Sequence, residues 1–363
     1  MKCTCLHELH VQQGALMAPF AGYDMPIQYD SIEQEHKAVR TSCGVFDVSH
    51  MGEVFVTGPA ATEFVNYIFT NDVAPLADRG ILYGMMLHPD GGTVDDLLVY
   101  KYDSHRYLLV INASNIDKDV AWIEKCAADF DVKVHNASEE YAELALQGPQ
   151  AEECMKSVLG IDGSDLGFYT FKELTAADGT VVLVSRTGYT GEDGFEIYAP
   201  AQYIVSVWMR LMEAGVQPCG LGCRDTLRFE AGLPLYGDEL TDEISPVEAA
   251  LSMFVKLDKG DFVGRQACVD QKADGVTRKV VGLEVMGQAI PRHGYEVLAA
   301  DSDTVVGHIT TGYRSITLER NLAMALVEAK YAALGTPLRV RVRRKIFDAV
   351  VIKKRFYTPN YKK

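Results

Sequence analysis

The chain has 363 residues, of which 48% are hydrophobic and 23% charged, and its formal net charge at pH 7 is −15. This composition is typical of a globular protein, because a disordered chain would lack the apolar residues that offset the entropy of ordering. Proteins that bind nucleic acid normally carry the opposite charge, so no nucleic-acid partner is expected. The length predicts two or three domains, since single cores rarely exceed roughly 250 to 300 residues.

The amino terminus and the cysteines indicate a compartment. Residues 1–14 lack the apolar run of roughly 7 to 15 residues that a signal peptide needs. No segment reaches about 18 uninterrupted apolar residues, so no membrane association is expected. The eight cysteines are too sparse for a disulfide scaffold, and only Cys219 and Cys223 come close to a metal pair. We therefore expect a cytoplasmic protein with reduced thiols and no metal.

Strands and helices alternate in the first part of the chain. Ser31 caps a predicted helix over 31–42. The patterns that follow predict strands at 51–57, 80–87, 93–102 and 107–112 and helices at 60–69 and 116–129. The Gly-rich turn at 89–92 joins two of these strands as a hairpin. Residues 51–136 are therefore predicted to form a compact α+β unit.

The second half of the chain divides near residue 250. Before this point we predict strands at 143–146, 194–198 and, as a pair, 171–185, and helices at 150–158, 202–214 and 222–231. After it, short strands separated by turn residues are predicted at 279–285, 295–298, 305–311, 323–327, 338–342 and 347–352. Few helical patterns interrupt these strands, which indicates a separate all-β module.

The carboxy-terminal segment is basic in an acidic protein. Residues 339–363 hold ten Lys or Arg and one acid, a net charge of +9. Arg339, Arg341 and Arg343 alternate with apolar residues, so a strand would place them on one face. This face is either the solvated side of an edge strand or a patch that attracts an acidic partner or a polyanionic tail.

Two acids lie in apolar strands, where a carboxylate is costly unless a donor or cation meets it. Asp96 shares a strand face with apolar and aromatic residues, whereas Asp95 points the other way. Glu196, in the DGFEIY sequence, has a similar setting. Each acid is either part of a structural salt bridge or a working carboxylate in a cleft, and the pattern alone does not separate the two.

A pair of arginines forms a second constellation. Arg224 and Arg228 are four residues apart and share a helical face suited to gripping a carboxylate or phosphate, although Asp225 and Glu230 could equally neutralise them. Common signatures such as GxxxxGK[ST], GxGxxG, GxSxG and HExxH are absent from the sequence.

Long motifs follow one another in a fixed order: FAGYDMPIQY (20–29), VRTSCGVFDVSHMGE (39–53), GGTVDDLLVY (91–100), NASNIDKD (112–119), SRTGYTGEDGFEIY (185–198), GLGCRDTLRFEAGLPLYG (220–237) and KGDFVGRQA (259–267). In these motifs the chain resembles, over essentially its whole length, the folate-binding T-protein family of the glycine cleavage system. The resemblance implies an α+β, three-domain cloverleaf around a central folate site. Its parts would be a discontinuous first domain (1–50 plus 137–245), an inserted ferredoxin-like α+β domain (51–136) and a carboxy-terminal jelly-roll-like β-barrel domain (246–363).

The resemblance also implies a reaction. Members of the family are aminomethyltransferases, which move the methylene of the aminomethyl group on the dihydrolipoyl arm of the H-protein to tetrahydrofolate and release ammonia. Tetrahydrofolate is the co-substrate, and neither a metal nor pyridoxal phosphate (PLP) is expected. The partner would be the lipoylated H-protein, with a functional link to the P- and L-proteins.

Site residues follow by match to the family motifs. Asp96 would face folate N10 and stabilise developing positive charge, and Arg292 would lie near it and keep it ionised. Glu196 and Arg228 would divide the pterin edge and the glutamate carboxylates of folate between them, and Tyr361 would also contact folate. Further wall candidates are Tyr83, Met51, Asn112 and Tyr169.

Three alternatives to this reading differ in what they predict. A YgfZ-like folate protein, of the branch associated with iron–sulfur protein maintenance, would have a K-G-C-Y-x-G-Q-E type motif where this chain has GLGCRDTLRFEAG. A folate-dependent demethylase would use different substrate contacts. A non-catalytic folate-binding scaffold would bind folate tightly without turnover.

Overall fold

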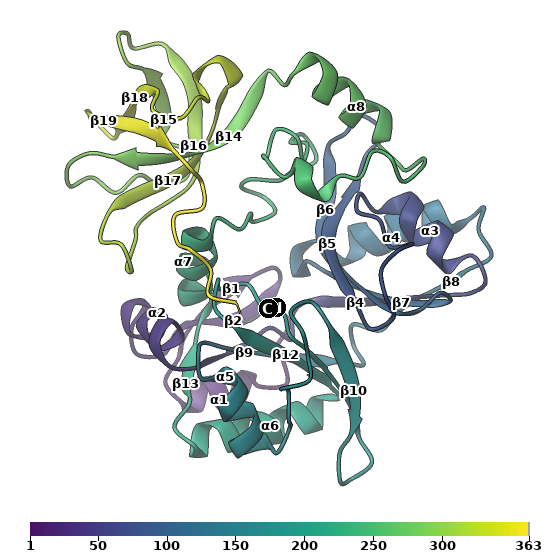
Figure 1. The fold of residues 1–363 in the computed structure, drawn as a ribbon. Coiled ribbons are helices and arrows are strands. Elements are labelled where there is room, and N and C mark those ends of the chain that lie inside the picture. The colour runs from purple at the N-terminus through teal and green to yellow at the C-terminus, as the bar shows by residue number, and fades with distance from the viewer. Residues whose placement is uncertain (362–363) are drawn as a thin grey trace.

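A computed structural model describes residues 1–361, and the last two lysines lie outside the described residues. Three β-structures form three lobes arranged around a common centre (Figure 1). From the barrel, the carboxy-terminal segment runs back toward this centre (Figure 1). None of the described helices combines the length and apolar character that crossing a bilayer requires.

The first lobe is built on a six-stranded sheet of order β10-β11-β12-β9-β3-β13. Its strands are β3 (Gly44–Asp47), β9 (Ala142–Gln147), β10 (Phe171–Thr175), β11 (Val181–Ser185), β12 (Gly194–Ala199) and β13 (Gln217–Cys219). The helices of this lobe are α1 (His7–Gln12), α2 (Ile32–Thr41), α5 (Ala151–Cys154) with a π-helical turn (Met155–Leu159), α6 (Ala201–Glu213) and α7 (Leu221–Ala231). A separate two-stranded sheet is formed by β1 (Leu16–Phe20) and β2 (Tyr23–Gln28). Trp208 of α6 and Phe195 of β12 are fully buried in the core of this lobe.

A five-stranded antiparallel sheet of order β5-β6-β7-β4-β8 forms the second lobe. The strands are β4 (Gly52–Thr57), β5 (Ile81–Leu87), β6 (Thr93–Asp103), β7 (Arg106–Ile111) and β8 (Lys133–Asn136), and α3 (Ala61–Ile68), the turn Ala113–Asn115 and α4 (Ile116–Ala127) complete it. Phe64 of α3 and Ile123 of α4 pack in one core with strand residues such as Val54. The predicted hairpin is present, with Met85 opposite Asp96 in the β5–β6 register.

The third lobe is a closed six-stranded barrel of order β14-β17-β16-β15-β18-β19. Its strands are β14 (Arg278–Val285), β15 (Glu296–Ala299), β16 (Val305–Arg314), β17 (Asn321–Glu328), β18 (Pro337–Val342) and β19 (Lys345–Ile352). All six strands were predicted, and closure removes the free sheet edges that an open module would expose. In the chain, the 3-10 turn Ser252–Phe254 and α8 (Arg265–Asp274) lie between the first lobe and the barrel. The 3-10 turn Ala329–Tyr331 lies within the barrel, between β17 and β18.

The elements that sequence patterns missed are short or lack periodicity. The four residues of β3 are all buried, so they show no alternation. Only Cys268 is buried in α8, which leaves that helix without an apolar stripe. The three-residue strand β13 contains Pro218, which is unfavourable within a strand.

Candidate active site

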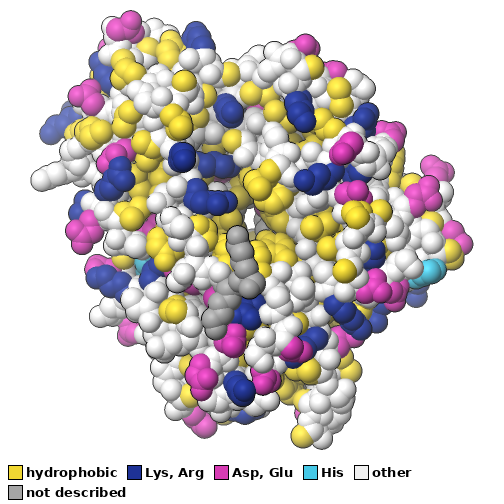
Figure 2. Space-filling view, in the orientation of Figure 1, with side chains coloured by type: hydrophobic (Ala, Val, Ile, Leu, Met, Phe, Trp, Pro, Cys, Tyr) yellow, Lys and Arg dark blue, Asp and Glu magenta, His cyan; other side chains and the backbone are white. Residues whose placement is uncertain are grey.

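A cavity of about 800 Å³ lies where the three lobes meet. Its wall is formed by β5, β6, α7, the segment 231–236 and the basic residues 353–355 of the carboxy-terminal segment. Figure 2 shows a hollow at the centre of one face with Lys and Arg side chains beside it. Seven of the residues implied by the family motifs line this cavity: Met51, Tyr83, Asp96, Asn112, Tyr169, Glu196 and Arg228.

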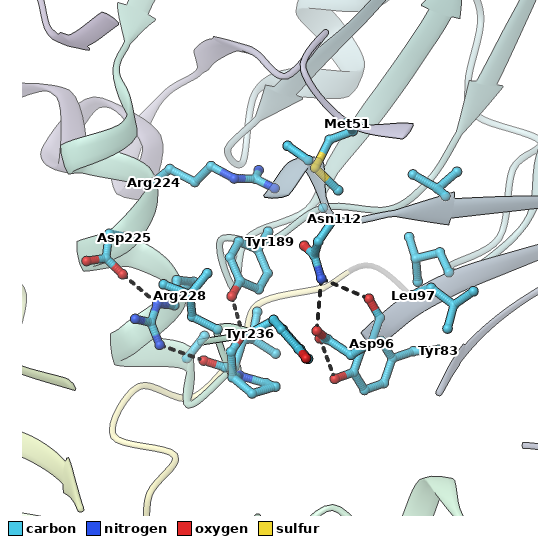
Figure 3. Close-up of a pocket in the computed structure, with 18 of the residues that line it drawn as sticks. Met51, Tyr83, Asp96, Leu97, Asn112, Tyr189, Arg224, Asp225, Arg228 and Tyr236 are labelled. Carbon is cyan, nitrogen blue, oxygen red and sulfur yellow. Dashed lines mark hydrogen bonds and ion pairs between the residues drawn. The ribbon is translucent and has the colours of Figure 1, made fainter. Parts of the chain in front are cut away.

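Asp96 presents its carboxylate to the cavity from β6 (Figure 3). The Tyr83 hydroxyl donates to Oδ2 at 2.8 Å and the Asn112 side-chain amide donates to Oδ1 at 3.0 Å. Burial and the neighbouring charge of Asp95 raise the pKa of Asp96 to about 7. The group is therefore close to half ionised at neutral pH, a state suited to responding to charge on a bound substrate.

Glu196 lies on the adjoining sheet, in β12, and is almost fully buried. The Thr187 hydroxyl donates to Oε2 at 2.5 Å. Burial raises the pKa of Glu196, and the bond from Thr187 opposes that effect. The cavity thus has a second carboxyl group that is costly to ionise without a hydrogen-bond donor from a ligand.

Arg228 is fully buried, and its guanidinium is already engaged. It donates to Asp225 at 2.6 Å and to Glu239 at 2.9 Å, and to the Thr311 hydroxyl at 3.0 Å. A further bond goes to the Leu233 carbonyl at 3.3 Å. Arg228 therefore ties α7 to the 233–239 segment and the barrel, and it has little donor capacity left for a ligand.

Arg224, one helical turn earlier, has the opposite character. It lines the cavity and extends toward Met51 and Asn112 (Figure 3). Its Nη1 is buried but has no hydrogen-bond partner among residues 1–361. The guanidinium carbon lies 4.7 Å from the centre of the Tyr189 ring. Of the two arginines that sequence spacing singled out, Arg224 is the one with a free donor.

Arg292 and Tyr361 lie away from the cavity wall. Arg292 is exposed and its guanidinium carbon is 5.2 Å from the centre of the Tyr313 ring, so the structure does not place it beside Asp96. Tyr361 stacks on Phe168 with ring centres 4.5 Å apart, and Phe168 is in turn 4.5 Å from the ring of Tyr169. Tyr361 therefore reaches the cavity through its neighbours.

Sequence reasoning missed other wall residues. Tyr189 lies in the glycine-rich loop before β12, and its hydroxyl donates to the Pro234 carbonyl. The hydroxyl of Tyr236 donates to the Thr93 carbonyl at 3.1 Å and accepts from Lys118 at 2.7 Å. His50 is buried, which lowers its pKa to about 4 and makes it neutral. An isolated tyrosine or histidine in a loop sequence belongs to no periodic pattern, so the sequence does not identify it as a cavity residue.

Side chains of metal-binding type cluster outside this cavity. Glu35, Cys219 and Cys223 lie within ligand distance of one another, and this is the only such group that residues 1–361 contain. The Glu35 carboxylate already accepts from the backbone N–H of Tyr29 at 2.6 Å and of Gly220 at 2.9 Å. These bonds stabilise the start of α7, which gives Glu35 a structural role.

Comparisons with known proteins agree over the full chain. The GCVT N-terminal domain model matches residues 6–259, and the model of the glycine cleavage T-protein C-terminal barrel domain matches residues 278–358. An aminomethyltransferase of Caldanaerobacter subterraneus is 49% identical over 100% of this chain and 98% of its own length, and one of Alkaliphilus oremlandii is 49% identical over 100% and 99%.

Structural similarity gives the same result. The crystal structure of glycine cleavage system aminomethyltransferase T from Bartonella henselae covers 100% of this chain and 99% of its own, with a TM-score of 0.94 and 33% identity. The motif resemblance is thereby confirmed, and the chain belongs to the glycine cleavage T-protein family.

Proposed function

We infer that the chain is the tetrahydrofolate-dependent aminomethyltransferase of a glycine cleavage system. Family membership supports the reaction type. The observation that carries the residue-level proposal is the cavity between the three lobes, where a half-ionised Asp96 faces an otherwise largely apolar and aromatic wall. A flat pterin fits such a wall, and a volume of about 800 Å³ accommodates a molecule of that size.

We assign Asp96 the stabilisation of positive charge. Tetrahydrofolate supplies the nitrogen nucleophile that accepts the methylene. The aminomethyl carbon becomes cationic as its bond to sulfur weakens, and a fixed carboxylate in a site of low polarity lowers the energy of that charge. The bonds from Tyr83 and Asn112 hold this carboxylate in place. The bound folate and the carrier arm would have to cover the open side of the cavity, because water that reached the cationic carbon would take the methylene as formaldehyde.

Folate recognition is assigned to two cavity groups, Glu196, whose pKa is raised by burial, and Arg224, which has an unpartnered donor. Glu196 would accept from the N–H donors along a pterin edge. Arg224 would pair with a carboxylate of the folate glutamate, in place of Arg228, because Arg228 is saturated by protein acceptors. Tyr169 and Tyr361 would complete the apolar wall, Tyr361 acting from behind Phe168.

The partner and the setting are also proposals. The lipoylated H-protein would deliver the aminomethyl group, and the P- and L-proteins would act before and after this step. The eight cysteines are free thiols, which is compatible with a reducing cytoplasm. We propose that residues 1–50 and 137–245 form one domain, 51–136 the second and 246–363 the third. The three lobes support this division, although the barrel of the third begins at Arg278 and the backbone N–H groups of Lys256 and Val263 bond to the second lobe.

The decisive experiment supplies aminomethyl-loaded H-protein and tetrahydrofolate to the purified chain. We expect ammonia and methylenetetrahydrofolate to form together, in equal amounts. Tight folate binding without turnover would support a non-catalytic scaffold instead. Activity on a free methylated amine, with none on the loaded carrier, would support a demethylase.

A further inference from the structure

Two adjacent aspartates on β6 are joined by one side chain. Asp96 faces the cavity and Asp95 faces the interior of the second lobe, as neighbours on a strand must. The Asn112 side-chain amide nitrogen donates to Asp95 Oδ1 at 2.8 Å and to Asp96 Oδ1 at 3.0 Å. It also lies 3.0 Å from the Asp96 carbonyl oxygen. We call this contact the Asn112 bridge.

Asp95 holds the bridge from a fully buried position. Besides the side-chain bond, it accepts from the Asn112 backbone N–H at 2.9 Å, and the Asn115 amide donates to Oδ1 at 2.7 Å. These three N–H donors fix the orientation of the carboxylate. Because two of these donors belong to Asn112, Asp95 determines where the Asn112 amide sits.

Asp119 of α4 supports Asp95 from the other side. Asp119 is fully buried, and neither of its carboxyl oxygens meets a hydrogen-bond donor within the described chain. It lies against Asp95, and burial followed by the Asp95 charge raises its pKa to about 11. Asp119 is therefore a neutral acid at pH 7, and two carboxyl groups in contact are compatible only when one carries the proton. Its O–H can be donated to Asp95, which concentrates the negative charge on Asp95.

We propose that Asp95 is a positioning residue for aminomethyl transfer, acting through the Asn112 bridge to fix the Asp96 carboxylate at the cavity and through its own charge to tune that carboxylate. The proposal rests on the proposed function. It adds Asp95, a fully buried residue that does not line the cavity. A structural role alone would not require the amide of Asn112 to bond both aspartates.

Other titratable groups around the two aspartates come from four elements. Tyr83 of β5 donates to Asp96, and Tyr189, from the loop before β12, is influenced by the Asp96 charge. Lys118 of α4 donates to the Val94 carbonyl at 2.5 Å and to Tyr236. Burial raises the pKa of both Tyr83 and Tyr189, so neither hydroxyl ionises near neutral pH. In this range the pH response of Asp96 is therefore set by its burial, by the Asp95 charge and by the bonds from Tyr83 and Asn112.

Asp95→Asn is the first test, with kcat, KM for tetrahydrofolate and the pH profile as readouts. The amide cannot accept from all three N–H donors, so kcat should fall by about tenfold or more while KM changes by less than about threefold. Loss of the Asp95 charge should lower the pKa of Asp96 and move the acidic limb down by about one pH unit. We expect the loss of this charge to outweigh any weakening of the bridge, because the two carboxylates are neighbours in a buried setting where water screens their repulsion weakly.

Asn112→Ala is the second test, and the acidic limb of its pH profile should move in the direction opposite to that of Asp95→Asn. It removes a donor that lowers the pKa of Asp96 while leaving the Asp95 charge in place, so the acidic limb should move to higher pH. The matched control is Asp103→Asn, the same substitution at the exposed end of β6, which should match the parent protein.

The two pH shifts decide the proposal. The proposal is supported if the acidic limbs of the two variants move in opposite directions and kcat falls. It is overturned if both limbs coincide with that of the parent protein or move in the same direction. A change in KM without a change in kcat also overturns it. If Asp95→Asn does not fold, Asn112→Ala alone decides, since Asn112 is partly exposed at the cavity. A parent protein with no turnover would reject the proposed function instead.

Discussion

The cavity has two walls with charged side chains, and the walls differ in how those charges are paired. The sheet wall, formed by Tyr83, Asp96 and Asn112, surrounds one carboxylate with neutral donors and no cation within ion-pair distance among the described residues. The helix wall, formed by Arg224, Asp225 and Arg228 on α7, contains a guanidinium saturated by acids and another with a free donor. The contrast shows that satisfied charges hold this fold together, while incompletely satisfied ones are left for ligands.

The difference matters because residue type alone does not show it. Arg224 and Arg228 share a helix and a face, yet one is a tie between lobes and the other is available. An ion pair that is already complete leaves a ligand nothing to gain. The predictions below separate stability from chemistry on the two walls.

The largest effect is expected from Asp96→Asn on the sheet wall. It removes the only charge assigned to stabilise the cationic carbon, so kcat should fall by about a thousandfold. The fold should not lose stability, since burial makes the ionised form of Asp96 unfavourable. Steady-state turnover and urea unfolding measure the two quantities. A variant with near-normal kcat would remove Asp96 from the mechanism.

On the helix wall, Arg228→Leu should act on stability. It leaves Glu239 and Asp225 without their cation, which should cost about 3–5 kcal/mol of unfolding free energy. Denaturant titration at neutral pH measures this loss. If stability is unchanged while folate affinity collapses, Arg228 is a ligand contact and the comparison between the walls fails.

Arg224→Leu is the matched substitution one turn earlier. Since one donor of Arg224 is unpaired, the unfolding free energy should change by less than about 1 kcal/mol. The dissociation constant for tetrahydrofolate should rise by about 10- to 100-fold, the cost of a charge-assisted contact. Calorimetric titration with tetrahydrofolate measures this constant. An unchanged value would show that a residue other than Arg224 binds the folate carboxylate.

A smaller effect follows from pH. The pKa of Asp96 is about 7 in the free protein, and the ionised form is the active one in our proposal. Below pH 7, kcat/KM should therefore fall about tenfold per unit as Asp96 takes up a proton, and above it the value should level off. A profile flat from pH 5 to 8 would contradict the assignment.

Much of the fold followed from sequence periodicity. The long elements β6, α4 and α6 and all six barrel strands were predicted, because each alternates or repeats its apolar residues. The misses were β3, β8 and β13, together with β1, β2, α1 and α8. The strand type of β3, β8 and β13 depends on neighbours that lie far away in the chain, as in the pairing of Gly44 with Gln147 and Gln217.

The site was predictable in its residues more than in their roles. Asp96, Glu196 and Tyr83 line the cavity as the family motifs implied. The choice between Arg224 and Arg228 needed the positions of Glu239 and Thr311, which come from other segments. The family motifs place Arg292 beside Asp96, but in the structure its guanidinium lies over the Tyr313 ring. This contact depends on the position of the barrel relative to the other lobes. No local pattern encodes such contacts.

The interruption of the first lobe has a consequence for how the protein is made. Strand β3 pairs with β9, about a hundred residues later, and with β13, later still. The sheet of the second lobe is complete between these points, from β4 to β8. During synthesis at about 5–20 residues per second, the second lobe has all its strands before β3 has a partner. Asp96 would then be placed on a finished sheet first, and the rest of the cavity would assemble against it.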